Sequence, residues 1–235
     1  MNEQHIASAF DRDLEGVQAM IMKMGGLVEQ QLTEAAQALE TRDDALATRV
    51  RETDKLIDAL DEQVNQEAAR LIALRAPAAK DLRTVLTVLK ISNNLERIGD
   101  YSKNLGKRSL VLAQMPVIPG AAGAIRRMAK AVEQMLKDAL DAYIHRDVDL
   151  AYDVRARDQD VDQMYNALFR EFLTHMMEDP RNITACMHLH FIAKNIERSG
   201  DHVTSIAEQV IYLATGQVPA EGRPKAESVT TVGIG

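Results

Sequence analysis

A five-residue segment occurs twice in this chain of 235 residues, and the repetition limits the folds open to it. The segment ERIGD at residues 96–100 returns as ERSGD at residues 197–201, which is 101 residues later. Such a match indicates an internal duplication, because a repeated sequence unit forms a repeated structural unit. The fold must therefore contain the same unit twice, in a chain long enough to bury a sizeable core.

The composition favours helices as the structure of this unit. Aromatic residues make up only 4% of the chain and tryptophan is absent, so Ala, Leu, Val, Ile and Met supply most apolar side chains. Alanine and unbranched side chains lose little conformational entropy in a helix. No segment alternates apolar and polar residues between turn signals, as a strand would. The sequence predicts an all-α fold with six helices, at about residues 6–39, 44–75, 78–113, 121–144, 148–177 and 181–215.

The duplication extends beyond the first motif. One further offset of 104 residues matches Asp43, Leu46, Ala47, Val50, Asp54 and Asp58 with Asp147, Leu150, Ala151, Val154, Asp158 and Asp162. Each half then holds three helices, which predicts two tandem, similar three-helix bundles. We expect them at residues 6–115 and 120–216, with Pro116 and Pro119 in the linker and residues 217–235 as a disordered tail. Before the second helix, Thr41, Asp43 and Asp44 are candidate N-caps.

Charge and hydropathy exclude several classes of function. The net charge of −7 argues against a general nucleic-acid binder and against attachment to anionic lipid, because both need a basic face. No apolar run reaches the roughly 18–20 residues that span a bilayer. The N-terminus lacks the apolar core of a signal peptide, and the single cysteine, Cys186, suits a reducing compartment. The sequence predicts a cytoplasmic protein without direct membrane insertion.

Acidic residues recur in pairs four positions apart, which places both members of a pair on one helix face. The pairs are Asp54/Asp58, Glu96/Asp100, Asp158/Asp162 and Glu197/Asp201. If neighbouring helices pack antiparallel, four carboxylates converge in each bundle. Oxygen ligands suit hard or borderline cations such as Mg²⁺, Mn²⁺, Ca²⁺ or iron. We therefore predict metal binding by these eight residues, with no catalytic residue among them.

A plainer interpretation is that the carboxylates form solvated ion pairs with nearby basic residues, each worth about 0–1 kcal/mol. The basic residues that could supply these pairs are Arg97, Lys103 and Lys55 in the first half and Arg198, Arg155 and Arg157 in the second. The glycines Gly99 and Gly200 indicate close approach by another helix or by a ligand, since glycine costs about 1 kcal/mol in a helix. We expect His190 to be a partly buried packing residue, and His202, like Tyr101 at the matching position, to pack as well.

The sequence resembles the PhoU family of phosphate-signalling regulators over about residues 6–216. The segments LERIGD at 95–100, APAAKDLR at 76–83 and NIERSGD at 195–201 carry the resemblance, together with the two aspartate pairs. The resemblance implies two three-helix bundles whose acidic motifs hold metal ions or clusters, often iron, while Mg²⁺, Mn²⁺ and Zn²⁺ remain open. The second copy departs from the family pattern at Ser199, where Ile is common, and at Ser205, which matches Asn104.

The resemblance also implies a cytoplasmic, non-enzymatic adaptor that negatively regulates phosphate uptake and phosphate-starvation signalling. Its implied partners are the ATPase subunit of the phosphate importer and a membrane sensor histidine kinase. Two alternatives stay open: a di-metal helical-bundle enzyme and a purely structural helical oligomer. The enzyme would need Glu-x-x-His motifs, which the acidic pairs lack. Long bundles with broad Ala-rich faces often pair, so we expect a homodimer.

Overall fold

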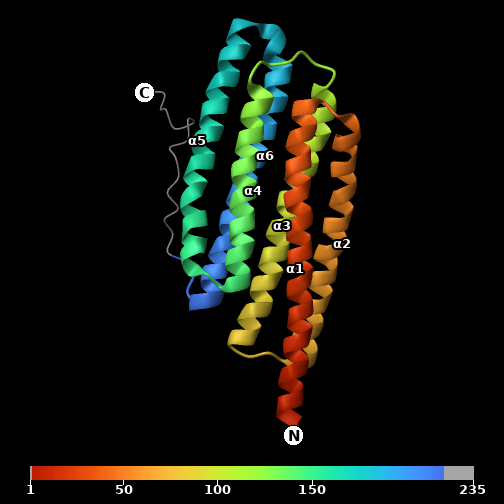
Figure 1. Cartoon of the computed structure of the whole chain (residues 1–235), viewed down its shortest axis with the longest axis vertical. Helices are drawn as coiled ribbons and strands as arrows, with labels where there is room; N and C mark the ends of the chain where they lie inside the picture. The colour runs from red at the N-terminus through yellow and green to blue at the C-terminus, as the bar shows by residue number, and fades with distance from the viewer. Residues whose placement is uncertain (1, 220–235) are drawn as a thin grey trace.

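The computed structural model describes residues 2–219, and most of the predicted tail lies outside them. Within that range the chain is all-α, with six helices joined by short connections (Figure 1). The helices are α1 (Asn2–Thr41), α2 (Asp44–Arg75), α3 (Lys80–Leu112), α4 (Ala121–His145), α5 (Val148–Glu178) and α6 (Ile183–Thr215). Among these described residues, no helix is both long enough and apolar enough to cross a membrane.

Matching N-caps begin the second helix of each half. The Asp43 side chain accepts a hydrogen bond from the Leu46 amide at 2.9 Å, and the Asp147 side chain accepts one from Leu150 at 3.0 Å. Each bond satisfies an amide that has no partner inside the helix. The duplication is therefore visible in the local structure as well as in the sequence.

Two of the three N-cap candidates were wrong, and the sixth helix begins slightly later than the approximate prediction. Thr41 and Asp44 do not cap α2, because Thr41 is the last residue of α1 and Asp44 is already helical. The sixth helix begins at Ile183 and not at residue 181, since residues 180–182 form a separate 3₁₀ turn, η1 (Pro180–Asn182). Asp179 begins that turn by accepting a hydrogen bond from the Arg181 amide at 3.0 Å.

The helices form two three-helix bundles, α1–α3 and α4–α6, that pack side by side with their long axes aligned (Figure 1). The bundles meet along α3 with α6 and along α1 with α4. One buried apolar cluster contains residues of all six helices, including Ile21 of α1, Ile98 of α3 and Ile206 of α6. The core is therefore continuous between the two copies.

The contact between α3 and α6 places the two motif copies next to each other on adjacent helices. The rings of Tyr101 and His202, which directly follow the two motifs, lie 5.7 Å apart between centroids. His202 also shares a hydrogen bond of 2.8 Å with Asn94 of α3. Farther along this contact, the Arg108 guanidinium lies 4.5 Å from the Phe191 ring centroid. The prediction that Tyr101 and His202 are packing residues is confirmed, and they pack against each other.

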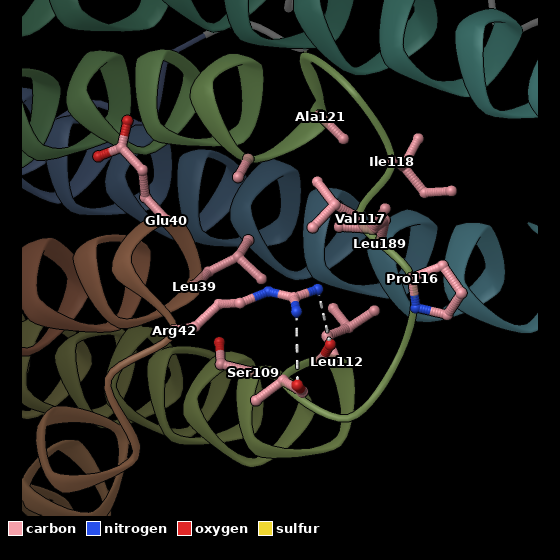
Figure 2. A pocket seen from close by; sticks show the side chains of 12 residues that line it. Leu39, Glu40, Arg42, Ser109, Leu112, Pro116, Val117, Ile118, Ala121 and Leu189 are labelled. Carbon is pink, nitrogen blue, oxygen red and sulfur yellow. Dashed lines mark hydrogen bonds between the residues drawn. The ribbon is translucent and has the colours of Figure 1, made fainter.

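The linker between the bundles is held by an arginine from the turn between α1 and α2. Figure 2 shows Arg42 reaching the end of α3, where it donates to the carbonyl of Leu112 at 3.2 Å. It also donates to the carbonyl of Met115, in the linker, at 2.8 Å. The Leu112 carbonyl, at the last residue of α3, also accepts from the Met115 amide at 3.0 Å, so the arginine adds a second bond there. A cavity of about 150 Å³ beside Arg42 is lined mostly by apolar side chains of both bundles. The arginine thus ties the first bundle to the linker that begins the second.

Candidate functional site

In the first bundle, carboxylates from α2 and α3 lie around one ammonium group. Lys103 Nζ is 2.6 Å from Asp54 Oδ2 and also 2.6 Å from Asp100 Oδ1, so it bridges the two helices. The Asp54 side chain is only 4% exposed, and its Oδ1 has no hydrogen-bond partner. We call the four predicted carboxylates of this bundle the first patch: Asp54, Asp58, Glu96 and Asp100.

Arg97 adds positive charge at the solvent side of the first patch. Its guanidinium lies 3.4 Å from Glu96 and 3.6 Å from Asp100, and its side chain is half exposed. Such exposed pairs add little to stability. The ion-pair interpretation therefore describes the rim of the patch, whereas the buried Asp54 and the partly buried Lys103 form a pair inside it.

The carboxylates of the first patch repel one another. Partial burial raises the pKa of Glu96; Arg97 opposes this, and Asp100 reinforces it. Partial desolvation and the neighbouring charge of Asp54 likewise raise the pKa of Asp58. Both shifts mean that removing a negative charge from the patch stabilises the native state relative to the unfolded chain.

Replacing Glu96 by glutamine is therefore expected to stabilise the metal-free protein at neutral pH. The native carboxyl binds its proton at higher pH than the unfolded chain, whose value is near 4.5, so the native carboxylate costs stability once pH rises above that value. Urea unfolding in EDTA should show a higher free energy of unfolding for Glu96→Gln than for the wild type at pH 7, and this gain should disappear below about pH 4. A gain of equal size at both pH values would contradict the electrostatic origin.

The predicted patch missed one carboxylate. Asp61 of α2 contributes to the raised pKa values of both Asp58 and Glu96, and it accepts a hydrogen bond of 2.6 Å from Ser92. The signal was present in the sequence, since Asp61 lies three residues after Asp58 and so shares its helix face. The acidic surface of the first bundle is therefore larger than the motif alone indicates.

The second patch, made of Asp158, Asp162, Glu197 and Asp201, occupies the matching place between α5 and α6. Asp158 is buried, and its Oδ1 would lie 3.3 Å from a Cβ atom added to Gly200. Burial raises the pKa of Glu197 against the effect of Lys194, whose Nζ lies 2.6 Å away. The charges of Asp201 and Asp162 act in the same direction as burial. The structure therefore brings these four carboxylates together too.

The basic residues near the second patch include two that face elsewhere. Arg155 pairs with Glu208 at 3.3 Å, and Arg157 pairs with Asp138 at 2.6 Å. Lys194, which the sequence did not single out, contacts Glu197 from one turn earlier in α6. The two patches thus share their carboxylates but differ in the cations around them.

The matched glycines allow close helix packing. A Cβ at Gly99 would lie 3.3 Å from Gln31 Oε1 and 3.3 Å from Ile57, while one at Gly200 would meet Asp158 and Val161. Such distances are shorter than ordinary van der Waals contact. Close approach by another helix, which was one of the two expectations for these glycines, is confirmed.

Oxygen ligands suit the metals that the sequence predicts, but the arrangement does not yet form a coordination site. Among the described residues, no three His, Cys, Asp or Glu side chains come close enough to hold one ion. In the first patch the reason is visible, because Lys103 lies between Asp54 and Asp100. The orphaned, buried Oδ1 of Asp54 is the atom that a cation there would satisfy.

Histidine adds no obvious ligand to the second patch. The His190 ring lies 5.2 Å from Phe169, 5.9 Å from Tyr165 and 5.7 Å from Phe191, measured between centroids. Burial, with help from Lys194, lowers the pKa of His190 below its ordinary value. The prediction of a partly buried packing histidine is confirmed.

The fold and its two patches define a class of duplicated six-helix proteins with one carboxylate patch in each three-helix half. The model of the PhoU domain matches residues 21–109 and 125–210, one match in each bundle. The chain belongs to the PhoU family. It is 43% identical to the phosphate-specific transport system accessory protein PhoU homolog of Rhizobium meliloti, over 99% of this chain and 98% of that protein.

Other relatives and solved structures agree with this membership. The homolog of the same name in Caulobacter vibrioides is 45% identical over 95% of this chain and 97% of its own length. The crystal structure of PhoU from Pseudomonas aeruginosa superposes with a TM-score of 0.86 at 39% identity, covering 88% of this chain and all of that one. The phosphate transport system regulatory protein PhoU from Streptococcus pneumoniae gives a TM-score of 0.82 at 28% identity, covering 89% and 99%.

Proposed function

We propose that this protein is a cytoplasmic regulatory adaptor that restrains phosphate uptake and phosphate-starvation signalling. Family membership over nearly the whole chain is the observation that carries the proposal, because relatives at 43% and 45% identity are named accessory proteins of phosphate-specific transport. Its partners are the ATPase subunit of the phosphate importer and a sensor histidine kinase. It acts through contacts with these partners and not as an enzyme.

We further propose that the two patches bind metal ions through their eight carboxylates. The support is the recurrence of four clustered carboxylates in each bundle, including the buried Asp54 and Asp158. A bound cation would favour the charged form of Glu96 and Glu197, whose pKa values are raised by burial first and by the neighbouring carboxylates second. Iron, Mg²⁺, Mn²⁺ and Zn²⁺ are the candidates, and the ion would stiffen the bundles or switch their partner contacts.

The adaptor role predicts direct, measurable binding to the importer. We expect the full chain to bind the purified ATPase subunit of its own phosphate importer in biolayer interferometry, and the cytoplasmic part of the kinase likewise. The ATPase subunit of an unrelated importer serves as the control. Absence of binding to both partners, with the chain folded by circular dichroism, would contradict the proposal.

The metal assignment has a separate test. A double variant, Asp100→Ala with Asp201→Ala, should lose bound metal in elemental analysis of protein purified without chelator, because each change removes one motif carboxylate from one patch. Asp149→Ala on the exposed first turn of α5 is the matched control. Unchanged stoichiometry in the double variant would contradict the carboxylate assignment. The predicted homodimer is checked on the same samples by light scattering after size exclusion.

A further inference from the structure

We infer that Lys103 is the built-in cation of the first patch, and that a metal ion binds there only by displacing its ammonium group. The inference rests on the proposed metal binding and goes beyond it, because it assigns a gating role to a residue outside the carboxylate motif. It also separates the two patches, which the duplicated carboxylates alone would make equivalent.

The position of the ammonium is the first argument. Lys103 Nζ lies 2.6 Å from one carboxylate oxygen on α2 and 2.6 Å from one on α3. A hard cation bridging the same two oxygens would sit about 2.0–2.6 Å from each. The two cations would therefore occupy the same place, and they cannot do so together.

A lysine side chain is positively charged at neutral pH. Its ammonium therefore competes with a metal ion for the two carboxylate oxygens that it contacts. The amine can still leave, because its side chain is 23% exposed and lies on a flexible stem.

The buried carboxylate has capacity that the lysine does not use. Asp54 Oδ1 is shielded from solvent and has no hydrogen-bond partner, while Oδ2 holds the ammonium. A metal ion could engage both oxygens of a carboxylate, which one N–H bond to Oδ2 does not do. If a metal ion displaced the lysine, both oxygens of Asp54 would have a partner, whereas Lys103 serves only Oδ2.

The second motif copy lacks a lysine at this position. The offset of 101 residues places Thr204 where the first copy has Lys103, and Thr204 is fully buried with no hydrogen-bond partner for its hydroxyl. Threonine carries no charge and cannot compete with a metal ion. The competitor inferred for the first patch is therefore absent at the matching position of the second, where a different lysine, Lys194, contacts Glu197.

The test measures Mn²⁺ binding to the full chain by electron paramagnetic resonance and isothermal titration. Lys103→Met removes the charge and keeps the apolar stem. We expect it to bind Mn²⁺ at the first patch about tenfold more tightly, or better, than the wild type. Adding Asp54→Asn should abolish the gain. Lys103→Arg, which keeps the charge, and Lys107→Met, on the exposed side of the same helix, should both resemble the wild type.

A second measurement needs no variant. Reductive methylation with formaldehyde, read by peptide mass spectrometry, should modify Lys103 more in the presence of Mn²⁺ than in EDTA, while Lys107 stays constant. Equal Mn²⁺ affinity of wild type and Lys103→Met, or methylation of Lys103 that Mn²⁺ leaves unchanged, would overturn the inference and leave the metal proposal standing. No Mn²⁺ on any of the proteins would overturn the inference and would remove Mn²⁺ from the candidate metals of the proposed function.

Discussion

The substitution Gly25→Val is expected to lower the free energy of unfolding by about 1–3 kcal/mol, because the added side chain overpacks the contact between the bundles. A Cβ atom at Gly25 would lie 2.4 Å from Leu140 Cδ1, and Leu140 is buried on α4. The two Cγ methyl groups of valine would extend farther from the backbone than this Cβ atom. For a protein of this size the melting midpoint should fall by roughly 2–4 °C per kcal/mol.

The neighbouring glycine supplies the control for this prediction. Gly26 is exposed, and no atom lies within 4 Å of a Cβ added there. Gly26→Val should change stability by no more than about 0.5 kcal/mol, and in the stabilising direction, because valine is the better helix former. Thermal unfolding of both variants gives the comparison. Equal midpoints for the two would show that α1 and α4 are not closely packed at Gly25.

Truncating Ile98 in the first motif is expected to cost about 2–5 kcal/mol, the usual range for removing a large buried aliphatic side chain. Ile98, which stands between Arg97 and Gly99 in the motif, is fully buried in the core that the two bundles share. Ile98→Ala therefore leaves a cavity at the level of the first patch. Urea unfolding monitored by circular dichroism in EDTA measures the loss without a contribution from bound metal.

The same position in the second motif should behave differently. Ser199 is equally buried, but its hydroxyl donates to the Asn195 carbonyl within its own helix at 2.9 Å. Ser199→Ala removes little volume and improves helix propensity, so we expect a change below about 0.5 kcal/mol. A loss of free energy of unfolding as large as that of Ile98→Ala would contradict the expected difference between the two motif copies.

Local features of the fold were predictable from the sequence because their causes lie within a few residues. Asp43 as an N-cap depends only on the amide three residues later, and the acidic pairs share a helix face through helical periodicity alone. The duplicated pattern then indicated that α2 and α3 present their pairs to each other. For the same reason Asp61 could have been included, since its spacing from Asp58 is also local.

Contacts between distant residues could not be read in this way. Nothing near Arg42 in the sequence indicates that it binds carbonyls about 70 positions later, at the end of α3. The contact of Tyr101 with His202 likewise depends on how α3 crosses α6. Such partners are set by the packing of whole helices, which repeats and periodicity do not specify.

By itself, the sequence determined that this protein is a duplicated all-α chain with a carboxylate patch in each half, because helix periodicity and repetition are local properties. Only the tertiary structure decided which cation enters the first patch. Lys103 is one turn from Asp100 but 49 residues from Asp54, and α2 must pack on α3 before its ammonium can bridge them. The packing of α3 on α6 then placed the two motifs next to each other in one continuous core.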